Sequence, residues 1–187
     1  MSKALRTSQA SQGIPEDTPI LLCLDLNIWC AALLADFKGR KNTSSQRLVQ
    51  IVRSGFCSLG DVELVISWGM LERLEKVLIY NLKVKRSIAR IYIEAIIGFA
   101  QLAPQLTLGG TGIVPLNDVE DAHVLETAIA GRAIILVTAN FKDFLSSDSQ
   151  VVIPQRHLFY FSPAHQLHIV HPYLMMDWLN TGAIPHM

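Results

Sequence analysis

The sequence has few cysteines, no net charge and no long hydrophobic run. Its three cysteines, Cys23, Cys30 and Cys57, form no C-x-x-C pair and leave an odd number, so neither a disulfide framework nor a cysteine zinc site is expected. No wholly apolar stretch approaches the roughly 20 residues that a membrane-spanning helix needs. The polar segment 1–18 has no apolar block of the kind found in signal peptides, and together these absences predict a cytoplasmic protein that does not enter a membrane.

The sequence is rich in apolar residues, and its charges are unevenly placed along the chain. Half of the 187 residues are hydrophobic and 17% are charged, which predicts one domain with large buried faces or a subunit interface. Residues 36–90 carry eleven basic and five acidic side chains, whereas residues 91–187 carry three basic and eight acidic ones. This polarity suits an enzyme that binds a polyanion and holds cations between carboxylates; complementary patches in a dimer are the alternative.

Alternating apolar runs and helical periodicities predict an α/β fold. Residues 1–19 are expected to form a flexible tail, residues 20–187 a single domain, and residues 147–187 a C-terminal extension packed on it. Buried strands are predicted at 20–24, 62–67, 133–137 and 157–161. Helices are predicted at 27–36, 45–54, 68–81, 85–103, 118–130 and 140–146, with a loop at 107–115 and a final helical turn at 174–179. Strand and helix in alternation imply a parallel sheet with helices on both faces.

Polar residues follow the predicted strands, where the functional crevice of such a sheet lies. These residues are Asp25, Asn27, Ser67, Thr138 and Asn140, and Asp118 and Asp121 open the helix before the strand at 133–137. Carboxylates gathered in one crevice repel one another unless a cation lies between them, and ligands that offer only oxygen favour Mg²⁺ or Mn²⁺. The alternative for the helix is that Asp118 is only its cap and Asp121 only a partner of its dipole.

Three segments resemble the PIN-domain nucleases. LLCLDLNIWCAAL (21–33) is similar to the family's opening strand and helix, and SWGMLERLEKVL (67–78) is similar to its Ser-led second helix. DVEDAHVLETAIAGRAIILVTANFKDFL (118–145) is similar to the closing signature, D-x-x-D-x-x-x-L-x-x-A followed by a strand and V-T. The third segment is the most specific, and the resemblance covers residues 20–145.

The resemblance implies a three-layer α/β/α PIN-like fold with a central, mostly parallel sheet and a ribonuclease site that uses Mg²⁺ or Mn²⁺. It implies that RNA is cut to a 5′-phosphate and a 3′-hydroxyl. Many members are homodimeric toxins paired with an antitoxin protein, so both partners are expected here. Carried over by position, Asp25 is the first metal ligand, Asp121 the third acid and Asn140 the occupant of the fourth position. Asp118 is the supporting acid about one helical turn before Asp121.

The resemblance breaks at the second acid of the family, which aligns with Arg73. Asn140 also offers a neutral oxygen where an acid is usual, and Glu75 or Asp143 could compensate. The Arg73 guanidinium could pair with Asp25 or Asp121 in place of a metal, or it could contact a substrate phosphate. The sequence therefore leaves two hypotheses open: a ribonuclease, or a catalytically degenerate PIN fold that binds nucleic acid or protein.

Basic residues after the first predicted helix, Lys38, Arg40 and Lys41, are expected to contact substrate phosphates, with a solvated surface as the alternative. No aromatic residues interleave with them, so base stacking has little support in the sequence. Asn27, Ser67, Arg73 and Thr138 complete the predicted substrate-binding set. The C-terminal histidines, His157, His165, His168 and His171, lack the flanking acids or cysteines of a zinc site and favour a partly exposed strand.

Overall fold

The computed structural model describes residues 18–102, 119–162 and 165–185. Its strands are β1 (Ile20–Leu24), β2 (Phe56–Cys57), β3 (Gly60–Ile66), β4 (Gln101–Leu102), β5 (Ile135–Val137), β6 (Ser149–Ile153), β7 (His157–Phe161) and β8 (Gln166–Val170). Its helices are α1 (Leu26–Phe37), α2 (Ser44–Ser54), α3 (Trp68–Lys76), α4 (Arg86–Phe99), α5 (Val119–Ala130) and α6 (Pro172–Thr181), with a π-helical turn η1 (Val77–Asn81) and a 3-10 turn η2 (Phe141–Phe144).

The sheet has parallel strands at its centre and antiparallel strands at its edges. Its order is β2-β3-β1-β5-β8-β7-β6, and β4 pairs with β3 beside this path. β1 is parallel to β3 and β5, and β8 is parallel to β5, so these four strands end at the same edge. β2, β6 and β7 run antiparallel to their neighbours. The prediction of a mostly parallel α/β sheet is confirmed.

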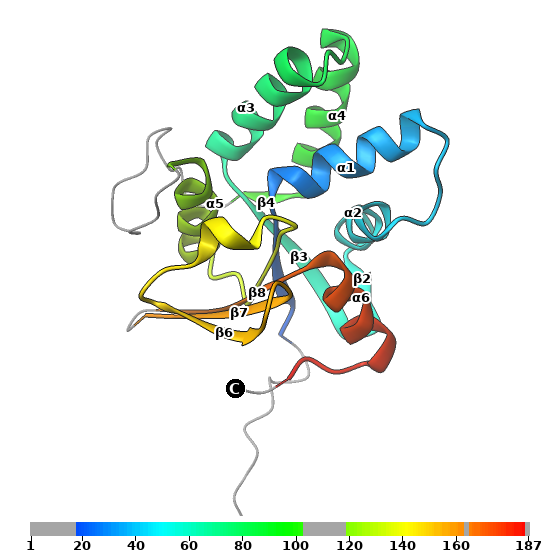
Figure 1. The fold of residues 1–187 in the computed structure, drawn as a ribbon. Helices are drawn as coiled ribbons and strands as arrows, with labels where there is room; N and C mark the ends of the chain where they lie inside the picture. The colour runs from blue at the N-terminus through cyan, green and yellow to red at the C-terminus, as the bar shows by residue number, and fades with distance from the viewer. Residues whose placement is uncertain (1–17, 103–118, 163–164, 186–187) are drawn as a thin grey trace, which may run out of the picture.

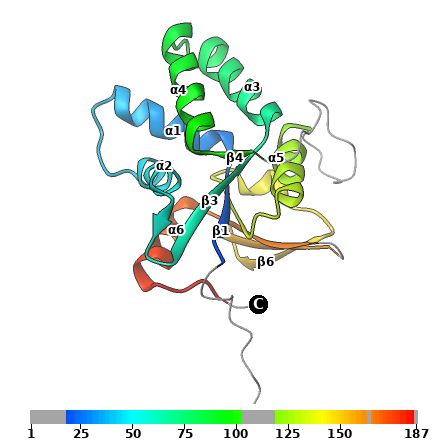
Figure 2. The same ribbon diagram turned by 180° about the vertical axis from the view of Figure 1, so that it is seen from behind.

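Helices cover both faces of this sheet and produce three layers. Figures 1 and 2 show α5 on one side of β1 and β3, and α1, α2 and α6 on the other. α2 packs against α1 and α6, whereas α5 packs against β3, β5 and η2. α3 and α4 pack against each other beyond the ends of the central strands. The arrangement is the expected three-layer α/β/α fold.

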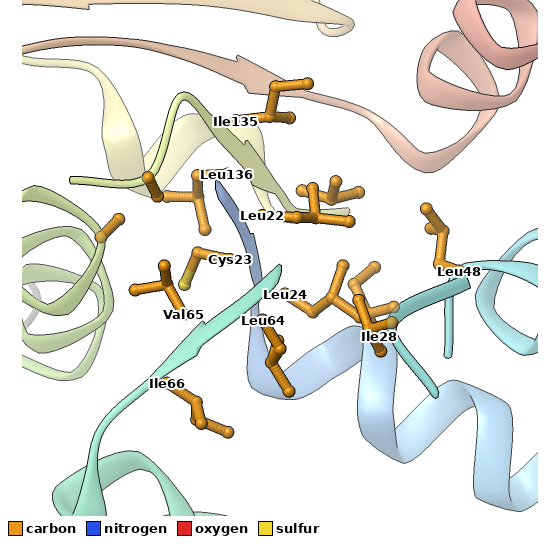
Figure 3. Close-up of a cluster of buried hydrophobic side chains, with 14 of the residues drawn as sticks. Leu22, Cys23, Leu24, Ile28, Leu48, Leu64, Val65, Ile66, Ile135 and Leu136 are labelled. Atoms are coloured by element: carbon orange, nitrogen blue, oxygen red, sulfur yellow. The ribbon is translucent and has the colours of Figure 1, made fainter. Parts of the chain in front are cut away.

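The central strands are apolar along their whole length because they are covered on both faces. In β1, Leu22, Cys23 and Leu24 are fully buried. Figure 3 shows them in the core with side chains of β3 and β5, and with Ile28 and Leu48 from the helices. This burial holds the last residue of β1 rigidly and fixes the position of whatever follows it.

Several boundaries differ from the predicted ones. The predicted helix 85–103 ends at Phe99, and residues 101–102 pair with β3 instead. The predicted helix 68–81 is α3 followed by η1, where the amide of Leu82 donates to the carbonyl of Val77. The predicted helix 140–146 is the short turn η2, and the final turn at 174–179 is the longer helix α6. The loop 107–115 and residues 1–17 of the predicted tail lie outside the described residues.

The C-terminal segment extends the sheet rather than only packing on it. β8 adds to the parallel core beside β5, and β7 and β6 continue the sheet to its edge. His171 then caps α6, which has Pro172 at its first position, a residue whose fixed φ suits the start of a helix. The start of α6 therefore lies at the carboxyl edge of the parallel strands.

Candidate active site

Asp25 lies where β1 passes into α1, at the middle of the parallel edge. Its amide donates to the carbonyl of Val137 at 3.0 Å, so the residue continues the pairing of β1 with β5 before the chain turns into the helix. The side chain is 4% exposed. The strand pairing therefore holds a buried carboxyl group at the end of the central strand.

Neutral hydrogen-bond donors surround the Asp25 carboxylate. The Thr138 hydroxyl donates to its Oδ2 at 2.7 Å, and the Asn27 side-chain amide donates to the same oxygen. Thr138 in turn accepts from the backbone amide of Asn140 at 2.9 Å, and Asn27 accepts from the amide of Ala139 at 3.3 Å. This network joins the ends of β1 and β5 and fixes the orientation of the carboxylate.

Burial raises the pKa of Asp25, and the hydrogen bonds from Thr138, the nearby backbone and Asn27 oppose this rise. The Asp25 charge also acts on its surroundings: burial first, and then Asp25, raise the pKa of Cys30 to about 11. Within the described residues, no positive charge is among the groups that act on Asp25. A buried carboxylate held only by neutral donors is a group whose ionised form a bound cation would stabilise.

A cavity of about 320 Å³ opens beside this carboxylate. It is lined by Asp25, Leu26, Asn27, Cys30, Val77, Leu82, Val124 and Asn140. Asp121 precedes Val124 by three residues in α5 and therefore lies about one helical turn away along that helix. Asp118 lies outside the described residues.

The donors at this cavity fit a hard divalent cation. Asp25 offers carboxylate oxygens and Asn140 an amide oxygen, and the Asn140 side chain caps no helix. No group of three histidine, cysteine, aspartate or glutamate side chains capable of holding a metal is present among the described residues. A complete ligand set here needs a further acid beside Asp25 and Asn140.

The family's second acid position, Arg73, lies in α3 next to α5. Burial lowers the pKa of His123, Glu126 opposes this change, and the charge of Arg73 adds to it. The hydrogen bonds to Asp25 come from Asn27 and Thr138, and no ion pair with Arg73 is found among the described contacts of this carboxylate. The described contacts of Asp25 therefore give no support to an Arg73–Asp25 pair, and pairing of Arg73 with Asp121 stays a prediction.

Three other predicted residues lie away from this cavity. Ser67 is fully buried: its hydroxyl caps α3 by accepting from the amide of Met70 and is 3.0 Å from the Thr127 hydroxyl. Glu75 in α3 and Asp143 in η2 are half-buried, and neither is among the described residues that line the cavity. Ser67 supports α3 and Thr127 rather than facing the opening.

The predicted phosphate contacts line two neighbouring cavities. Lys38 and Arg40 line one of about 420 Å³, together with Ala139, His171 and Tyr173. Arg40 also lines a second cavity of about 910 Å³, together with Lys41. The sequence did not identify His171 and Tyr173 as part of this region. The sequence signal that could have identified them is the apolar run of β8 followed by His171-Pro172, because this pattern indicates a strand followed by the capped start of a helix.

The remaining C-terminal histidines form a structural cluster. His157 Nε2 and His168 Nδ1 are 2.9 Å apart, and both rings pack edge-on against Trp178. His165 Nε2 lies 2.7 Å from the carbonyl oxygen of Ala133. Of the described histidines in this region, none joins a group that could hold a metal.

The three-layer fold, with polar groups at the carboxyl ends of its parallel strands, defines an α/β domain whose ligand site is expected at that edge. A family profile of the PIN domain matches residues 22–142, and the chain belongs to this family. A search of curated proteins gave no match. No helix in the described part of the chain is long and apolar enough to cross a membrane. PIN domains generally use divalent metal ions and act on nucleic acids.

Proposed function

We propose that the protein is an endoribonuclease of the PIN type that depends on Mg²⁺ or Mn²⁺ and leaves a 5′-phosphate and a 3′-hydroxyl. The observation that carries the proposal is the Asp25 carboxylate, which is 4% exposed and held by neutral donors beside a cavity that Asn140 also lines. Membership of the PIN-domain family supports the same chemistry.

Asp25, Asp121 and Asn140 are the proposed metal ligands, and Asp118 is the proposed supporting acid. A bound divalent ion supplies an activated water and stabilises charge on the phosphodiester. Thr138 and Asn27 hold the Asp25 carboxylate in a fixed orientation, so little reorganisation is needed on loading. Because metal binding requires the ionised carboxylate, a raised pKa at Asp25 makes loading weaken as the pH falls.

The basic residues Lys38, Arg40 and Lys41 are proposed to bind the phosphates that flank the cleaved bond. All three side chains are exposed, and they line two cavities, one of which is also lined by Ala139, the neighbour of Asn140. Exposed cations that line a groove beside a catalytic cavity attract a polyanionic strand and raise its rate of association.

The test measures two properties of the wild type and of Asp25→Asn: cleavage of a labelled RNA and the melting temperature with and without Mn²⁺. The wild type is expected to cut RNA and to melt higher when Mn²⁺ is added, because an ion that binds only the folded state stabilises it. Asp25→Asn, which keeps the shape of the side chain, is expected to lose both effects. If the wild-type protein neither cleaves RNA nor changes its melting temperature when Mn²⁺ is added, the proposal that it is an enzyme is disproved.

A second candidate function is a PIN-fold binding module without catalysis, and Arg73 is the observation that favours it. An arginine stands at the second acid position of the family, and the charge of this residue in α3 contributes to lowering the pKa of His123 in α5. RNA binding without cleavage in either Mg²⁺ or Mn²⁺ is the result that supports this function.

The toxin role, an antitoxin partner, a cytoplasmic location, and a single domain over residues 20–187 are also proposed. A homodimer is proposed through α4 and η1, where Tyr80, Ile88 and Ile91 are exposed. Exposed apolar side chains gathered on neighbouring elements are typical of a subunit interface. Light scattering of the wild type and of Ile91→Lys measures this: the proposal expects a dimer in the first and a monomer in the second.

A further inference from the structure

A second cavity lies next to the candidate site along α1. Asn27 lines the site cavity, and Ala31, one helical turn later, lines the neighbouring cavity of about 420 Å³. Consecutive residues after β5 also line the two cavities, Asn140 the first and Ala139 the second. Four residues of helix rise about 6 Å. The second cavity is therefore a close neighbour of the first.

The topology of the sheet brings an aromatic side chain to this second cavity. β8 is parallel to β5, with Val137 opposite Val170, so the residues after Thr138 and those after Val170 emerge side by side. The amide of Thr138 donates to the carbonyl of Val170 at 3.0 Å. Tyr173, in the first turn of α6, consequently lines the cavity together with Ala139.

Tyr173 presents an exposed ring on a fixed support. Its side chain is 62% exposed, although tyrosine rings are usually at least partly covered. The ring centroid lies 4.9 Å from that of His171, which lies 6.4 Å from that of the buried Phe141. His171 is held in place because its Nδ1 accepts from the amide of Tyr173. The three rings form a row that leads outward from the residue next to Asn140.

Positively charged side chains line the same cavity as Tyr173. Lys38 and Arg40 line it from the end of α1 and the loop that follows, and both are exposed. Arg40 also lines the larger cavity of about 910 Å³, to which Lys41 and Arg47 add positive charge and Asp36 the one negative charge among its described lining residues. A positively charged groove that also offers an exposed aromatic ring is the arrangement that binds single-stranded nucleic acid without reading its sequence.

We propose that the cavity between Tyr173 and Lys38 holds one unpaired RNA base next to the cleaved phosphodiester. The base stacks on the exposed ring of Tyr173, and Lys38 and Arg40 bind the phosphates of the same stretch of strand. A cavity of about 420 Å³ is within the range of roughly 300–1,000 Å³ that small ligands occupy. The proposal rests on RNA being the substrate and adds that the substrate is single-stranded at this point.

The test measures binding of a short fluorescein-labelled single-stranded RNA by anisotropy in EDTA, so that no cleavage occurs. Tyr173→Ala is expected to weaken binding about 5- to 150-fold, the effect of losing one base–aromatic stack. Tyr173→Phe keeps the ring and is expected to bind within about twofold of the wild type. Phe161→Ala is the matched control, because Phe161 is 45% exposed on β7, is not among the described residues that line the three cavities, and is expected to leave binding unchanged.

A set of the same RNA with one abasic nucleotide at each position separates stacking from loss of fold. The wild type is expected to lose affinity for the RNA abasic at one position, and Tyr173→Ala is expected to bind all members of the set equally. The stacking site is overturned if Tyr173→Ala binds like the wild type, if its abasic profile matches the wild-type profile, or if a duplex of the same sequence binds the wild type equally well.

The outcomes for the two proposals are separable. Cleavage without any Tyr173 effect keeps the nuclease and overturns the stacking site. The expected Tyr173 effect without cleavage in Mg²⁺ or Mn²⁺ supports the stacking site and overturns the nuclease. If the wild-type protein binds no RNA, the stacking site is overturned, and a protein partner becomes the candidate ligand of these cavities.

Discussion

The network around Asp25 and the histidine pair of β7 and β8 are two polar clusters on the same sheet, and Asp25 and His157 are buried whereas His168 is half-buried. His157 and His168 satisfy each other through one hydrogen bond of 2.9 Å and are enclosed by Trp178. Asp25 receives hydrogen bonds from the side chains of Thr138 and Asn27 and from the nearby backbone, yet its carboxyl group keeps a raised pKa and borders a cavity. One cluster closes on itself, whereas the other keeps an oxygen ligand facing open space.

Polar groups that satisfy each other, as the two histidines do, differ from a polar group such as Asp25 that can bind a ligand. Burying two neutral groups that hydrogen-bond to each other costs little free energy, whereas protonating either of them destabilises the folded state. A buried carboxylate without a cation costs the folded state free energy that better packing could remove. Such a cost at the carboxyl edge of a parallel sheet is the pattern expected of a ligand site.

The largest expected effect comes from removing the hydroxyl that orients Asp25. Thr138→Val leaves the amide of Asn140 without its acceptor and frees the carboxylate to turn. We expect RNA cleavage in Mn²⁺ to fall about 10- to 100-fold, as for other residues that hold a metal ligand in place. Initial rates of cleavage of a labelled RNA measure this.

Thr127→Val is the matched control for that substitution. Thr127 is as fully buried as Thr138, and its hydroxyl bonds Ser67 and the carbonyl of His123 rather than Asp25. We expect a lower melting temperature and a cleavage rate within about twofold of the wild type, since the lost hydrogen bonds are structural. Equal loss of cleavage in both variants would remove the distinction between the two threonines.

Acid is expected to weaken the histidine pair. Burial first, and then the charge of His157, lower the pKa of His168 from 6.5 to about 4. The folded state therefore binds fewer protons than the unfolded state in this window, so stability present above pH 6.5 is lost as the pH falls toward 4. One pKa unit corresponds to about 1.4 kcal/mol, and solvent screening reduces the total to the order of 2 kcal/mol.

Urea unfolding of the wild type and of His168→Gln at pH 7 and pH 5 measures this effect. The variant keeps a polar side chain that does not titrate, so its midpoint should change less between the two pH values. The account of the pair fails if the variant and the wild type lose the same stability on acidification.

The central sheet and its ligand edge were predictable from sequence because they depend on local signals. The run Ile20–Leu24 followed by Asp25 marks a strand covered on both faces that ends in a polar group, and the structure has this strand. The start of α5 was predicted from its acids and the helical spacing of its apolar residues. The roles of the acids come from family resemblance and remain proposals.

The groove beside the site was not predictable because it depends on pairing between distant strands. β8 could have paired in either direction, and the parallel choice beside β5 is what places Tyr173 near Lys38. Sequence spacing alone separated this aromatic residue from the basic residues and argued against stacking. The end of α4 was missed for a related reason, since the pairing of residues 101–102 with β3 overrides helical periodicity.

Removing the buried charge is expected to stabilise the metal-free protein. Because the pKa of Asp25 is raised in the folded state, ionisation costs stability as the pH rises from 3.8 through the folded value. Asp25→Asn removes this cost, and in EDTA at pH 7 we expect a gain on the order of 1 kcal/mol, or about 2–4 °C in melting temperature. The gain should vanish near pH 4, where both side chains are neutral. A variant that melts lower than the wild type in EDTA would contradict the buried charge.

The smallest expected effect concerns salt. Arg40→Gln removes one proposed phosphate contact at the junction of the two basic cavities. Affinity for single-stranded RNA should fall, and the slope of log K against log salt should decrease in magnitude by about 0.7. Arg132→Gln, a change at an exposed arginine that lines neither cavity, is the control and should leave the slope unchanged.

The central claim is that the Asp25 carboxylate holds a divalent cation, and anomalous diffraction from crystals soaked in Mn²⁺ tests it most directly. The account predicts a manganese peak within ligand distance of Asp25 and Asn140 in the wild type, and no peak in Asp25→Asn. An empty cavity in wild-type crystals, at a Mn²⁺ concentration that supports cleavage in solution, would contradict it.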